Sequence, residues 1–504
     1  MTNLKHAIAL NGPEARALEQ HRQDAGAGEE LAGALAQIVG AQNVATDFDT
    51  LIRYGRDCLP YAKYLYRSGD LPGTLPAAVV RPANTQEMAS IVKLTRERGA
   101  RVIPVGTCSG VLGGAIPLCR EISLDTSRMD KIVKIDEVNR TVTVQAGMNG
   151  GDFEQALNEK GWTAGHYPQS INISTVGGWA ACRGGGQASS RFGKIEDIVI
   201  GLTIVLPDGE VLAIAPQARR AVGPSVKDIF IGSEGTLGIV TELTLRIWAV
   251  PQATEDLVIA FPDVGAATSC ARDMMQAELR PAIVRIYDAE ETASRTSGLD
   301  VFQSLPVMMF LSFSGLRPLV AAEKSVGLEI VARHGGKEAP TGPFRDWRES
   351  RYVSASQSWT DKGYFMDTVE VTLPWSTLVN GYERMAERVR AVSPDAHFGA
   401  HWSHVYPDGA CQYMTFRLPP MPDAEALPLH AAIWDALQEV ALDCGGTISH
   451  HHGVGVFRGK WMRREHGVAL DVLQALKDAL DPGNLFNPGK MGLRQADGAV
   501  RINP

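Results

Sequence analysis

The stretch IGSEGTLGIVTE at residues 231–242 places three glycines ahead of an apolar, β-branched run. Small residues of this kind leave backbone N–H groups free to line a concave anion site. Three more glycine-containing stretches precede it, and they are PVGTCSGVLGG (104–114), QSINISTVGGWAACRGGGQ (169–187) and RFGKIED (191–197). Ser109, Ser174 and Thr175 would add hydroxyl donors to such a site. A single stretch would suit a tight turn in a β-rich domain, but four in order favour loops that hold a phosphate-bearing ligand.

Several familiar classes of protein are excluded by what the sequence lacks. No GxGxxG opens a helix and no GxxxxGK[ST] occurs, which removes Rossmann and P-loop sites. The seven cysteines form no CxxC pair, which excludes a conventional zinc ribbon or iron–sulfur cluster and suits reduced thiols. The net charge of −8 argues against a nucleic-acid binder. Without an apolar run of about 18 residues or a signal peptide, we expect a cytoplasmic protein with no transmembrane segment.

The first half of the chain is expected to combine helices, strands and hairpins. Residues 1–70 look helical. Asn84 and Glu87 fit a capping box for the next helix, and a buried strand should follow at 101–105. Two β-hairpins are expected, from segments 131–135 with 141–145 and 198–206 with 211–215.

The pattern of predicted helices and strands changes after Pro251, where longer amphipathic segments alternate with strand-like ones. This alternation predicts a second, α+β domain, as does a chain of 504 residues, which is too long for one ordinary core. The helices are expected around 264–278, 319–334, 376–391 and 424–442. The turn-rich stretch LDPGNLFNPGK (480–490) should close a structure rather than begin one.

Together, the glycine stretches resemble a known family. The ordered set P-x-G-x-x-S-G-x-x-G-G, S-T-V-G-G-W, R-F-G-x-x-x-D, L-P-D-G-E and G-S-E-G-T-L-G-I-V-T-E is similar to the FAD-binding domain of the vanillyl-alcohol oxidase/p-cresol methylhydroxylase superfamily. The resemblance covers residues 75–250, and DPGNLFNPGK matches the superfamily's usual C-terminal segment. It implies an α+β fold in which a two-subdomain FAD-binding domain carries an α+β substrate cap. The expected divisions are an N-terminal helical segment (1–70), the FAD-binding domain (71–250), the cap (251–480) and a C-terminal segment returning to the FAD domain (481–504).

The resemblance also implies which residues hold FAD. Pro104–Gly110 would wrap the pyrophosphate, Gln169–Thr175 and Cys182–Gly185 would line the cofactor, and Glu234–Val240 would contact its adenosine half or flavin ring. The residues implied in cofactor binding are Pro104, Val105, Gly106, Thr107, Cys108, Ser109, Gly110, Gln169, Ser174, Thr175, Gly177, Gly178, Cys182, Arg183, Gly184, Gly185, Glu234, Gly235, Thr236, Gly238, Ile239 and Val240.

The first loop departs from the family's P-x-G-G-G-T-S, because Thr107 and Cys108 stand where two glycines are expected. Both have a Cβ, so we expect the turn to avoid positive φ there and the pyrophosphate contact to be rearranged. Members with covalent flavin usually have a histidine where Ser109 stands, so FAD is expected to be bound non-covalently. Attachment through Cys108 is the other option.

Two segments of the second domain, HFGAHWSHVYPDGACQY (397–413) and GGTISHHHGVG (445–455), hold six of the twelve histidines. They fit a metal site, acid–base chemistry beside the flavin, or histidines that satisfy backbone groups. In the superfamily's 2-hydroxyacid dehydrogenases the corresponding motifs supply a metal. Here His404 keeps the first position, but Gln412 and His451 replace a histidine and a glutamate, so we expect no metal.

The cap more closely resembles alkylglycerone-phosphate synthase and its bacterial relatives, which carry Y-D-A-G-A-C-x-Y and S-H-H-H-G-V-G. By resemblance, Tyr413 would be the proton donor or acceptor, and His450, His451 and His452 would hold the substrate at the flavin. Arg285 stands where that subgroup has a functionally important arginine, and His404 completes the candidate catalytic set.

Two synthase positions do not carry over. Ser356 stands at the position of an arginine that grips the acyl carboxylate, although Arg351 or Arg348 could substitute from a shifted loop. Gln169 stands where an aspartate is expected.

These losses favour an FAD-dependent oxidase or dehydrogenase that takes a hydride from a hydroxylated, anionic small molecule to flavin N5. Arg285 would orient the anionic group, and Tyr413 or His451 would remove the hydroxyl proton. The alternative is a synthase-like transferase that uses FAD as a covalent electrophile without net oxidation. A flavin-binding subunit without its own turnover is a third hypothesis. The electron acceptor stays open, and a homodimer is one assembly that the sequence allows.

Overall fold

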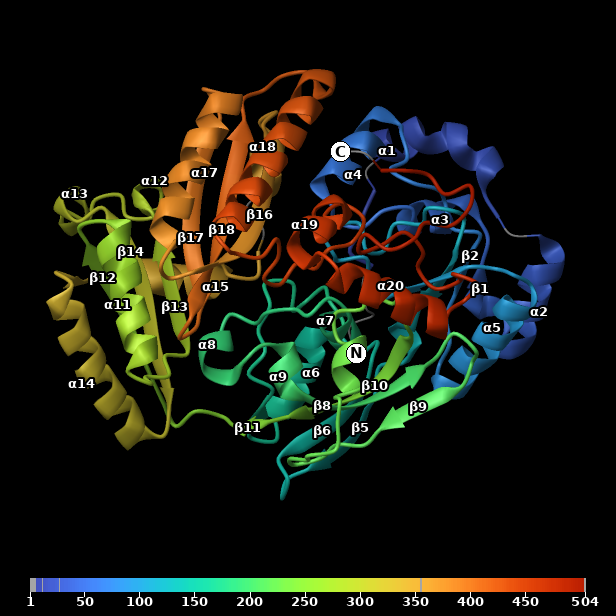
Figure 1. Cartoon of the computed structure of the whole chain (residues 1–504), viewed down its shortest axis with the longest axis horizontal. Coiled ribbons are helices and arrows are strands. Elements are labelled where there is room, and N and C mark those ends of the chain that lie inside the picture. Colours follow the sequence, from blue (N-terminus) through green and yellow to red (C-terminus); the bar gives the residue numbers. More distant parts are fainter. Residues whose placement is uncertain (1–5, 11, 27, 354–355, 503–504) are drawn as a thin grey trace.

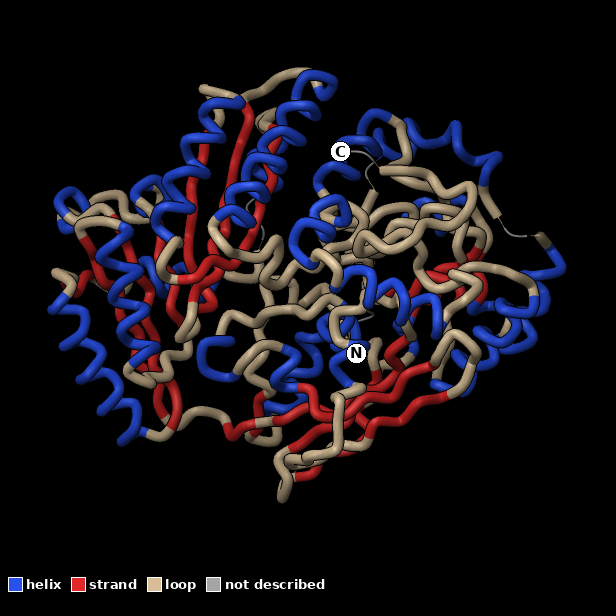
Figure 2. The backbone as a smooth tube through the Cα atoms, in the orientation of Figure 1, coloured by secondary structure: helices blue, strands red, loops and turns tan. Residues whose placement is uncertain are grey.

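The computed structural model describes residues 6–502, except 11, 27, 354 and 355. Helices and strands alternate along the chain, in agreement with the expected α+β class. Figures 1 and 2 show one large sheet with its helices at one end of the molecule and the smaller sheets towards the other. Loops gather between these two ends in Figure 2. Among the described residues, no helix is both long and apolar enough to cross a membrane.

The N-terminal part of the chain forms a four-stranded sheet of order β1-β2-β4-β3. Its strands are β1 (Val44–Ala45), β2 (Ala78–Val80), β3 (Val102–Val105) and β4 (Ile122–Asp125). Both β2 and β3 run parallel to β4. Helix α5 (Thr85–Glu97) begins where the Asn84 side chain accepts a hydrogen bond from the N–H of Glu87. Asn84 is therefore the N-cap, but the Glu87 carboxylate accepts from the N–H of Ala83 at 2.8 Å in place of that of Asn84, so the predicted capping box forms only in part.

The expected helices of the first 70 residues are present, with β1 and short 3₁₀ turns between them. They are α1 (Gly12–Ala17), α2 (Glu29–Val39), α3 (Phe48–Tyr54) and α4 (Pro60–Ser68). Helices α2 and α5 bury their apolar faces against the four-stranded sheet. Ahead of α1, the Ala7 N–H donates to the carbonyl of Thr107, so the N-terminal segment contacts the first glycine stretch.

A five-stranded antiparallel sheet has the order β5-β6-β10-β8-β9. Its strands are β5 (Ile132–Asp136), β6 (Thr141–Gln145), β8 (Val199–Val205), β9 (Val211–Ile214) and β10 (Ile239–Arg246). The β5–β6 and β8–β9 pairs are the two predicted hairpins. Helices α6 (Gly150–Asn158), α7 (Val176–Ala181), α8 (Ser189–Phe192) and α9 (Ile195–Ile198) lie between this sheet and the rest of the molecule.

The second half of the chain builds a seven-stranded sheet of order β15-β12-β14-β13-β17-β18-β16, antiparallel throughout. Its strands are β12 (Ala253–Phe261), β13 (Ile283–Tyr287), β14 (Val307–Gly315), β15 (Lys337–Ala339), β16 (Phe365–Pro374), β17 (His397–Val405) and β18 (Gly409–Leu418). The four predicted helices are α11 (Val264–Gln276), α14 (Arg317–Arg333), α17 (Leu378–Val392) and α18 (Asp423–Asp443), and they lie on one face of the sheet (Figure 1). On the other face, α15 (Gly342–Ser350) packs Phe344 against Phe310.

The C-terminal segment returns to the first half of the molecule. The N–H of Val102 in β3 donates to the carbonyl of Leu485, and the N–H of Asn487 donates back to the carbonyl of Val102. In helix α20 (Ala469–Leu480), the buried Lys477 donates from Nζ to the carbonyl of Thr236 at 2.8 Å. The segment therefore adds a partner to the exposed edge of β3.

Candidate active site

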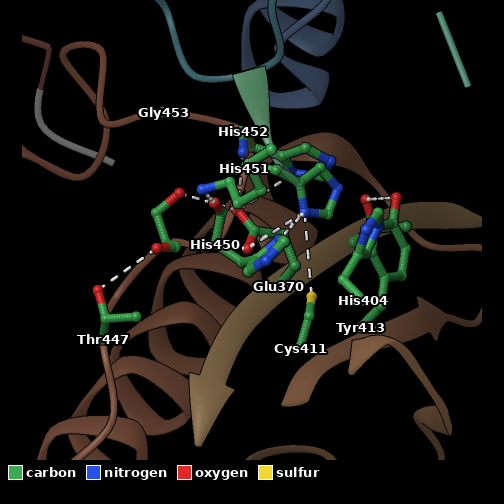
Figure 3. A network of polar contacts seen from close by, with 12 residues as sticks. Glu370, His404, Cys411, Tyr413, Thr447, His450, His451, His452 and Gly453 are labelled. Carbon is green, nitrogen blue, oxygen red and sulfur yellow. Dashed lines mark hydrogen bonds and ion pairs between the residues drawn. The ribbon is translucent and has the colours of Figure 1, made fainter. Parts of the chain in front are cut away.

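The candidate catalytic residues of the cap lie close together and are shielded from solvent. His404 is at the end of β17, Tyr413 is in β18, and His450–His452 follow α18 in a loop. The ring centroid of His404 lies 4.8 Å from that of His450 and 4.9 Å from that of His451. The Tyr413 ring lies 6.2 Å from His451 and 5.5 Å from His452 (Figure 3). The structure thus brings together residues that are almost 50 positions apart in the sequence.

A chain of hydrogen bonds joins this cluster to the first half of the molecule. Ser189 Oγ in α8 lies 2.8 Å from His404 Nδ1 and 3.1 Å from the hydroxyl of Tyr406. The Tyr406 hydroxyl lies 2.9 Å from His450 Nε2, and His450 Nδ1 lies 2.9 Å from His451 Nδ1. Every link can carry one proton, because each atom is a hydroxyl oxygen or an imidazole nitrogen.

Burial decides the protonation of the cluster. It lowers the pKa of His404 to about 3, with Arg285 and Lys194 adding to the effect, and lowers the pKa of His450 and His451 well below 6.5. Burial also raises the pKa of Tyr413 to about 12. Near neutral pH the imidazoles are therefore uncharged, while the phenol keeps its proton and can only donate it.

Glu370 of β16 holds the histidine loop from the cap side. Its carboxylate accepts hydrogen bonds from the N–H groups of His450 and His452 and from the hydroxyl of Ser449. Arg458 Nη1 donates to the same carboxylate at 2.8 Å, and both side chains are 0% exposed. Burial alone would raise the pKa of Glu370, but Arg458, His452 and the N–H of His450 outweigh it and lower the pKa to about 2.

Glu234 holds the other end of the loop from the FAD-binding side. Its carboxylate accepts hydrogen bonds from the N–H groups of Val454 at 2.6 Å and Gly455 at 2.8 Å. Burial raises the pKa of Glu234, and these two N–H groups only partly offset the rise. The side chain of Glu234 was expected to contact the cofactor, but it is hydrogen-bonded to the histidine loop.

Four side chains in the cluster come close enough to share a metal ion. Glu370, Cys411, His450 and His451 each place a ligand atom within 4.8 Å of the others. Both oxygens of Glu370 already accept hydrogen bonds, and Arg458 neutralises its charge. The metal set considered from the sequence does not assemble, because Gln412 points to the sulfur atoms of Met385 and Met414. This arrangement is a hydrogen-bonded cluster rather than a ligand shell.

Arg285 is a cation at the edge of the cluster. Its Nε donates to the hydroxyl of Tyr287 at 2.7 Å, and its guanidinium lies over the rings of Tyr287 and Trp347. Among the described residues, no carboxylate forms an ion pair with it. His401 stacks on Tyr413 with ring centroids 4.7 Å apart, and Arg285 contributes to the lowered pKa of its imidazole. The charge of Arg285 is therefore available to an anion.

The first glycine stretch has the features of an anion cradle. The N–H groups of residues 107–110 donate to no acceptor in the part of the chain that the structure describes. A Cβ built on Gly110 would meet no atom closer than 3.5 Å, and the same is true of Gly184. Free N–H groups beside the exposed Gly110 fit the pyrophosphate of FAD, so the residues present suit the cofactor.

One expectation about this stretch is wrong. Cys108 adopts φ +57° in spite of its Cβ, so the turn does use the left-handed conformation at one of the two substituted positions. Such a conformation costs roughly 1–2 kcal/mol for a residue other than glycine. The buried Cys108 packs with Ile8 and Val105, and this packing helps to offset the strain.

Other predicted cofactor residues hold the loops together instead of facing open space. A Cβ on Gly177 would lie 2.5 Å from the Cβ of Ala146, and one on Gly235 would lie 2.2 Å from Pro104 Cγ. Gly106 and Gly238 are blocked in the same way by Thr175 and Ile204. The hydroxyl of Thr175 caps α7, Ser174 Oγ accepts from Trp179, and Thr107 Oγ1 donates to the carbonyl of Ile173. Gln169 and Arg183 are exposed.

Gly185 joins the cradle to the catalytic cluster. A Cβ on it would lie 3.1 Å from His451 Cβ, 3.4 Å from His450 Cε1 and 3.5 Å from His404 Cε1. A flavin ring in contact with 184–185 would therefore lie next to the histidines. The predicted cofactor loop and the candidate catalytic residues are therefore adjacent at Gly185.

Comparisons with known proteins agree with this geometry. Residues 76–215 match the family model described as FAD binding domain, and residues 250–491 match that described as FAD linked oxidases, C-terminal domain. The uncharacterized FAD-linked oxidoreductase YgcU of Escherichia coli K12 is 31% identical, over 90% of this chain and 96% of its own length. The chain belongs to the FAD-linked oxidoreductase family. The predictions of an FAD-dependent oxidoreductase and of a resemblance to the superfamily are confirmed.

Members of this family with other names are also similar. The alkyldihydroxyacetonephosphate synthase of Caenorhabditis elegans is 30% identical, over 83% of this chain and 76% of its own length. A solved alkyldihydroxyacetonephosphate synthase matches with a TM-score of 0.80 at 24% identity, over 96% of this chain and 89% of that one. p-Cresol methylhydroxylase matches with a TM-score of 0.76 at 17% identity, over 93% of this chain and 98% of that one. These structures share the fold.

Sequence reasoning missed two residues that hold the histidine loop, Glu370 and Arg458, and it also passed over the buried His166. Glu370 interrupts the apolar strand segment TVEVTL, and a charge between two valines of a buried strand indicates a paired carboxylate. The sequence therefore contained a signal by which Glu370 could have been found. Arg458 and His166 stand in segments that suggest no role for them.

Proposed function

We propose that the protein is an FAD-dependent oxidase or dehydrogenase that oxidises a hydroxylated, anionic small molecule. FAD, when bound, supplies the acceptor for the hydride. The observation that carries the proposal is the unpaired Arg285 beside a cluster of uncharged imidazoles at Gly185. Arg285 would bind the anionic group of the substrate, so that its hydroxyl carbon is held against the flavin.

Protonation favours different roles for Tyr413 and His451. Because the pKa of Tyr413 is raised to about 12, its phenol stays protonated. The hydroxyl donates to Thr368 Oγ1 at 3.0 Å in the structure, and it would turn to donate a hydrogen bond to the substrate. The uncharged His451 can accept the hydroxyl proton, and Glu370 lies 3.8 Å from its Nδ1, where it would stabilise the imidazolium. The connected imidazoles and hydroxyls could then carry the proton away towards Ser189.

The synthase-like transferase remains the second candidate because relatives of that name cover most of the chain. Of the two arginines that could replace the missing one, Arg348 is the less suitable, because it is already paired with a carboxylate. Arg348 is paired with Asp256 at 2.6 Å, and Arg351 lies over the ring of Tyr352 beside a groove lined by Glu154. The side chain of Ser356 lies outside the described residues. These observations support the oxidoreductase over the synthase.

An anaerobic substrate screen tests the proposal. FAD-loaded protein is mixed with 2-hydroxy acids, with neutral alcohols of equal length, and with an acyl-glycerone phosphate, while flavin absorbance is followed. We expect lasting bleaching by a hydroxy acid and weaker bleaching by its neutral counterpart. In Arg285→Gln this preference should shrink. If every hydroxylated compound leaves the flavin oxidised and only the acyl-glycerone phosphate reacts, the synthase reading is right.

A further inference from the structure

His166 is a fully buried histidine with no assigned task. It follows β7 (Trp162–Thr163) and is 0% exposed. Neither ring nitrogen has a hydrogen-bond partner among the residues that the structure describes. Burial lowers its pKa to about 3, so the ring is a neutral imidazole with one N–H donor and one acceptor. Leaving both groups unpaired away from water is costly, which points to a partner that binds between them.

The ring lies at the wall of the flavin cradle. A Cβ on Gly184 would point towards His166 and stop 3.8 Å from its Nε2. The other side of the imidazole packs on Trp179, with ring centroids 4.7 Å apart. The backbone of 165–167 runs beside that of 186–187, and the N–H of Gln187 donates to the carbonyl of Tyr167. His166 is thus fixed between Trp179 and the buried Gly184, within contact distance of the predicted cofactor loop.

Gly185, which follows Gly184, indicates which part of FAD would lie beside His166. Gly185 abuts the histidine cluster, so a flavin ring that reacts beside these histidines would lie at 184–185. His404 and Lys194 are near enough to contribute to the lowered pKa of His166. An isoalloxazine edge offers carbonyl oxygens and ring nitrogens as acceptors and an N–H as donor, which complements a neutral imidazole. By the family resemblance, the pyrophosphate is expected at the first glycine stretch, Pro104–Gly110.

We propose that His166 is a flavin-binding residue whose imidazole hydrogen-bonds the isoalloxazine ring of FAD. The proposal rests on the FAD cofactor of the family and not on the substrate reaction. A donor at this ring stabilises reduced flavin more than oxidised flavin, because reduction increases the electron density on the acceptor atoms. His166 therefore tunes the redox potential as well as the affinity.

Two variants of nearly equal shape test this inference. His166→Gln keeps a donor and an acceptor, whereas His166→Met keeps only the volume. We expect His166→Met to bind oxidised FAD about tenfold more weakly, and reduced FAD about a further tenfold, a fall in midpoint potential of about 30 mV for a two-electron couple. His166→Gln should stay close to the unmodified protein. The readouts are FAD titration, the visible spectrum and dye-coupled potentiometry, none of which needs a substrate.

His430 provides the control, since it is also 0% exposed and also has one unpartnered ring nitrogen, but it lies in the core of the cap. His430→Met should lower the melting temperature without moving the flavin potential. If His166→Met keeps the affinity, spectrum and potential of the unmodified protein, His166 is only a core residue and the proposal is wrong. Should that variant not fold, histidine ¹⁵N labelling of the unmodified protein decides the point. The His166 ring signals, assigned with His166→Gln, must shift when FAD is added to apoprotein, and unmoved signals overturn the proposal.

Discussion

Replacing Glu370 with glutamine removes the charge opposite Arg458 and turns one acceptor oxygen into a donor that faces other donors. Breaking a buried ion pair by removing one partner costs about 3–5 kcal/mol, because the remaining charge stays buried. The pKa of Glu370 leads to a similar figure, since a fall from 4.5 to about 2 corresponds to roughly 3 kcal/mol at 1.36 kcal/mol per pH unit. Two independent routes therefore agree on the size of the effect.

Thermal unfolding of the FAD-loaded protein measures this loss. At about 2–4 °C per kcal/mol, Glu370→Gln should lower the melting temperature by roughly 6–20 °C. The control is Glu439→Gln, the same chemical change in an ion pair with Arg388 in which both side chains are about half exposed, at 47% and 54%. That exposed pair should contribute at most about 1 kcal/mol. Equal melting temperatures for the two variants would refute the reasoning.

Arg458 allows a second comparison. If the cost of Glu370→Gln comes from an unpaired buried cation, adding Arg458→Met should recover part of the lost stability. A further loss in the double variant would mean that Arg458 stabilises the loop in another way, through its hydrogen bonds to the carbonyls of Gly453 and Glu370.

Three further predictions concern the same site. Tyr413→Phe should abolish substrate-dependent bleaching while leaving FAD bound, and an unchanged rate would remove this phenol from the mechanism. Gly455→Ala should cost at least about 2 kcal/mol in a urea titration, since φ is +55° and the new Cβ would lie 2.0 Å from the carbonyl oxygen of Leu112; a stable variant would contradict the described packing. Because the folded-state pKa of Glu370 is lowered to about 2, its stabilisation is complete above pH 4.5 and is lost as the pH falls from 4.5 to 2; Glu370→Gln should lack this component of acid unfolding.

The glycine stretches and the histidine cluster could be predicted because each is encoded in a short run of residues. Such a run indicates the same kind of site wherever it lies in the fold. The sequence could not show which glycines leave room for a ligand and which make room for neighbouring protein residues. A Cβ on Gly184 would make only ordinary contacts with its neighbours, whereas Gly177 and Gly235 make room for Ala146 and Pro104, which come from other segments.

That division changes how cofactor binding should be tested. Bulky residues at Gly177 or Gly235 would force backbone segments apart, so loss of colour there would report misfolding and not a lost contact. The hydrogen-bond partners of the Glu234 side chain could not be predicted, for a related reason. Its partners, Val454 and Gly455, lie about 220 residues further along the chain, and backbone N–H groups leave no trace in a sequence.

The pairing of β3 with the C-terminal segment has a consequence during synthesis. Val102 finds its hydrogen-bond partners, Leu485 and Asn487, only when nearly 400 further residues have been made. At about 5–20 residues per second, the edge of β3 stays unpaired on the ribosome for roughly 20–80 s. A bare strand edge is a template for pairing with another chain. Slow translation or early release of the polypeptide should therefore favour aggregation, and a chaperone that shields the first half should raise the yield of folded protein.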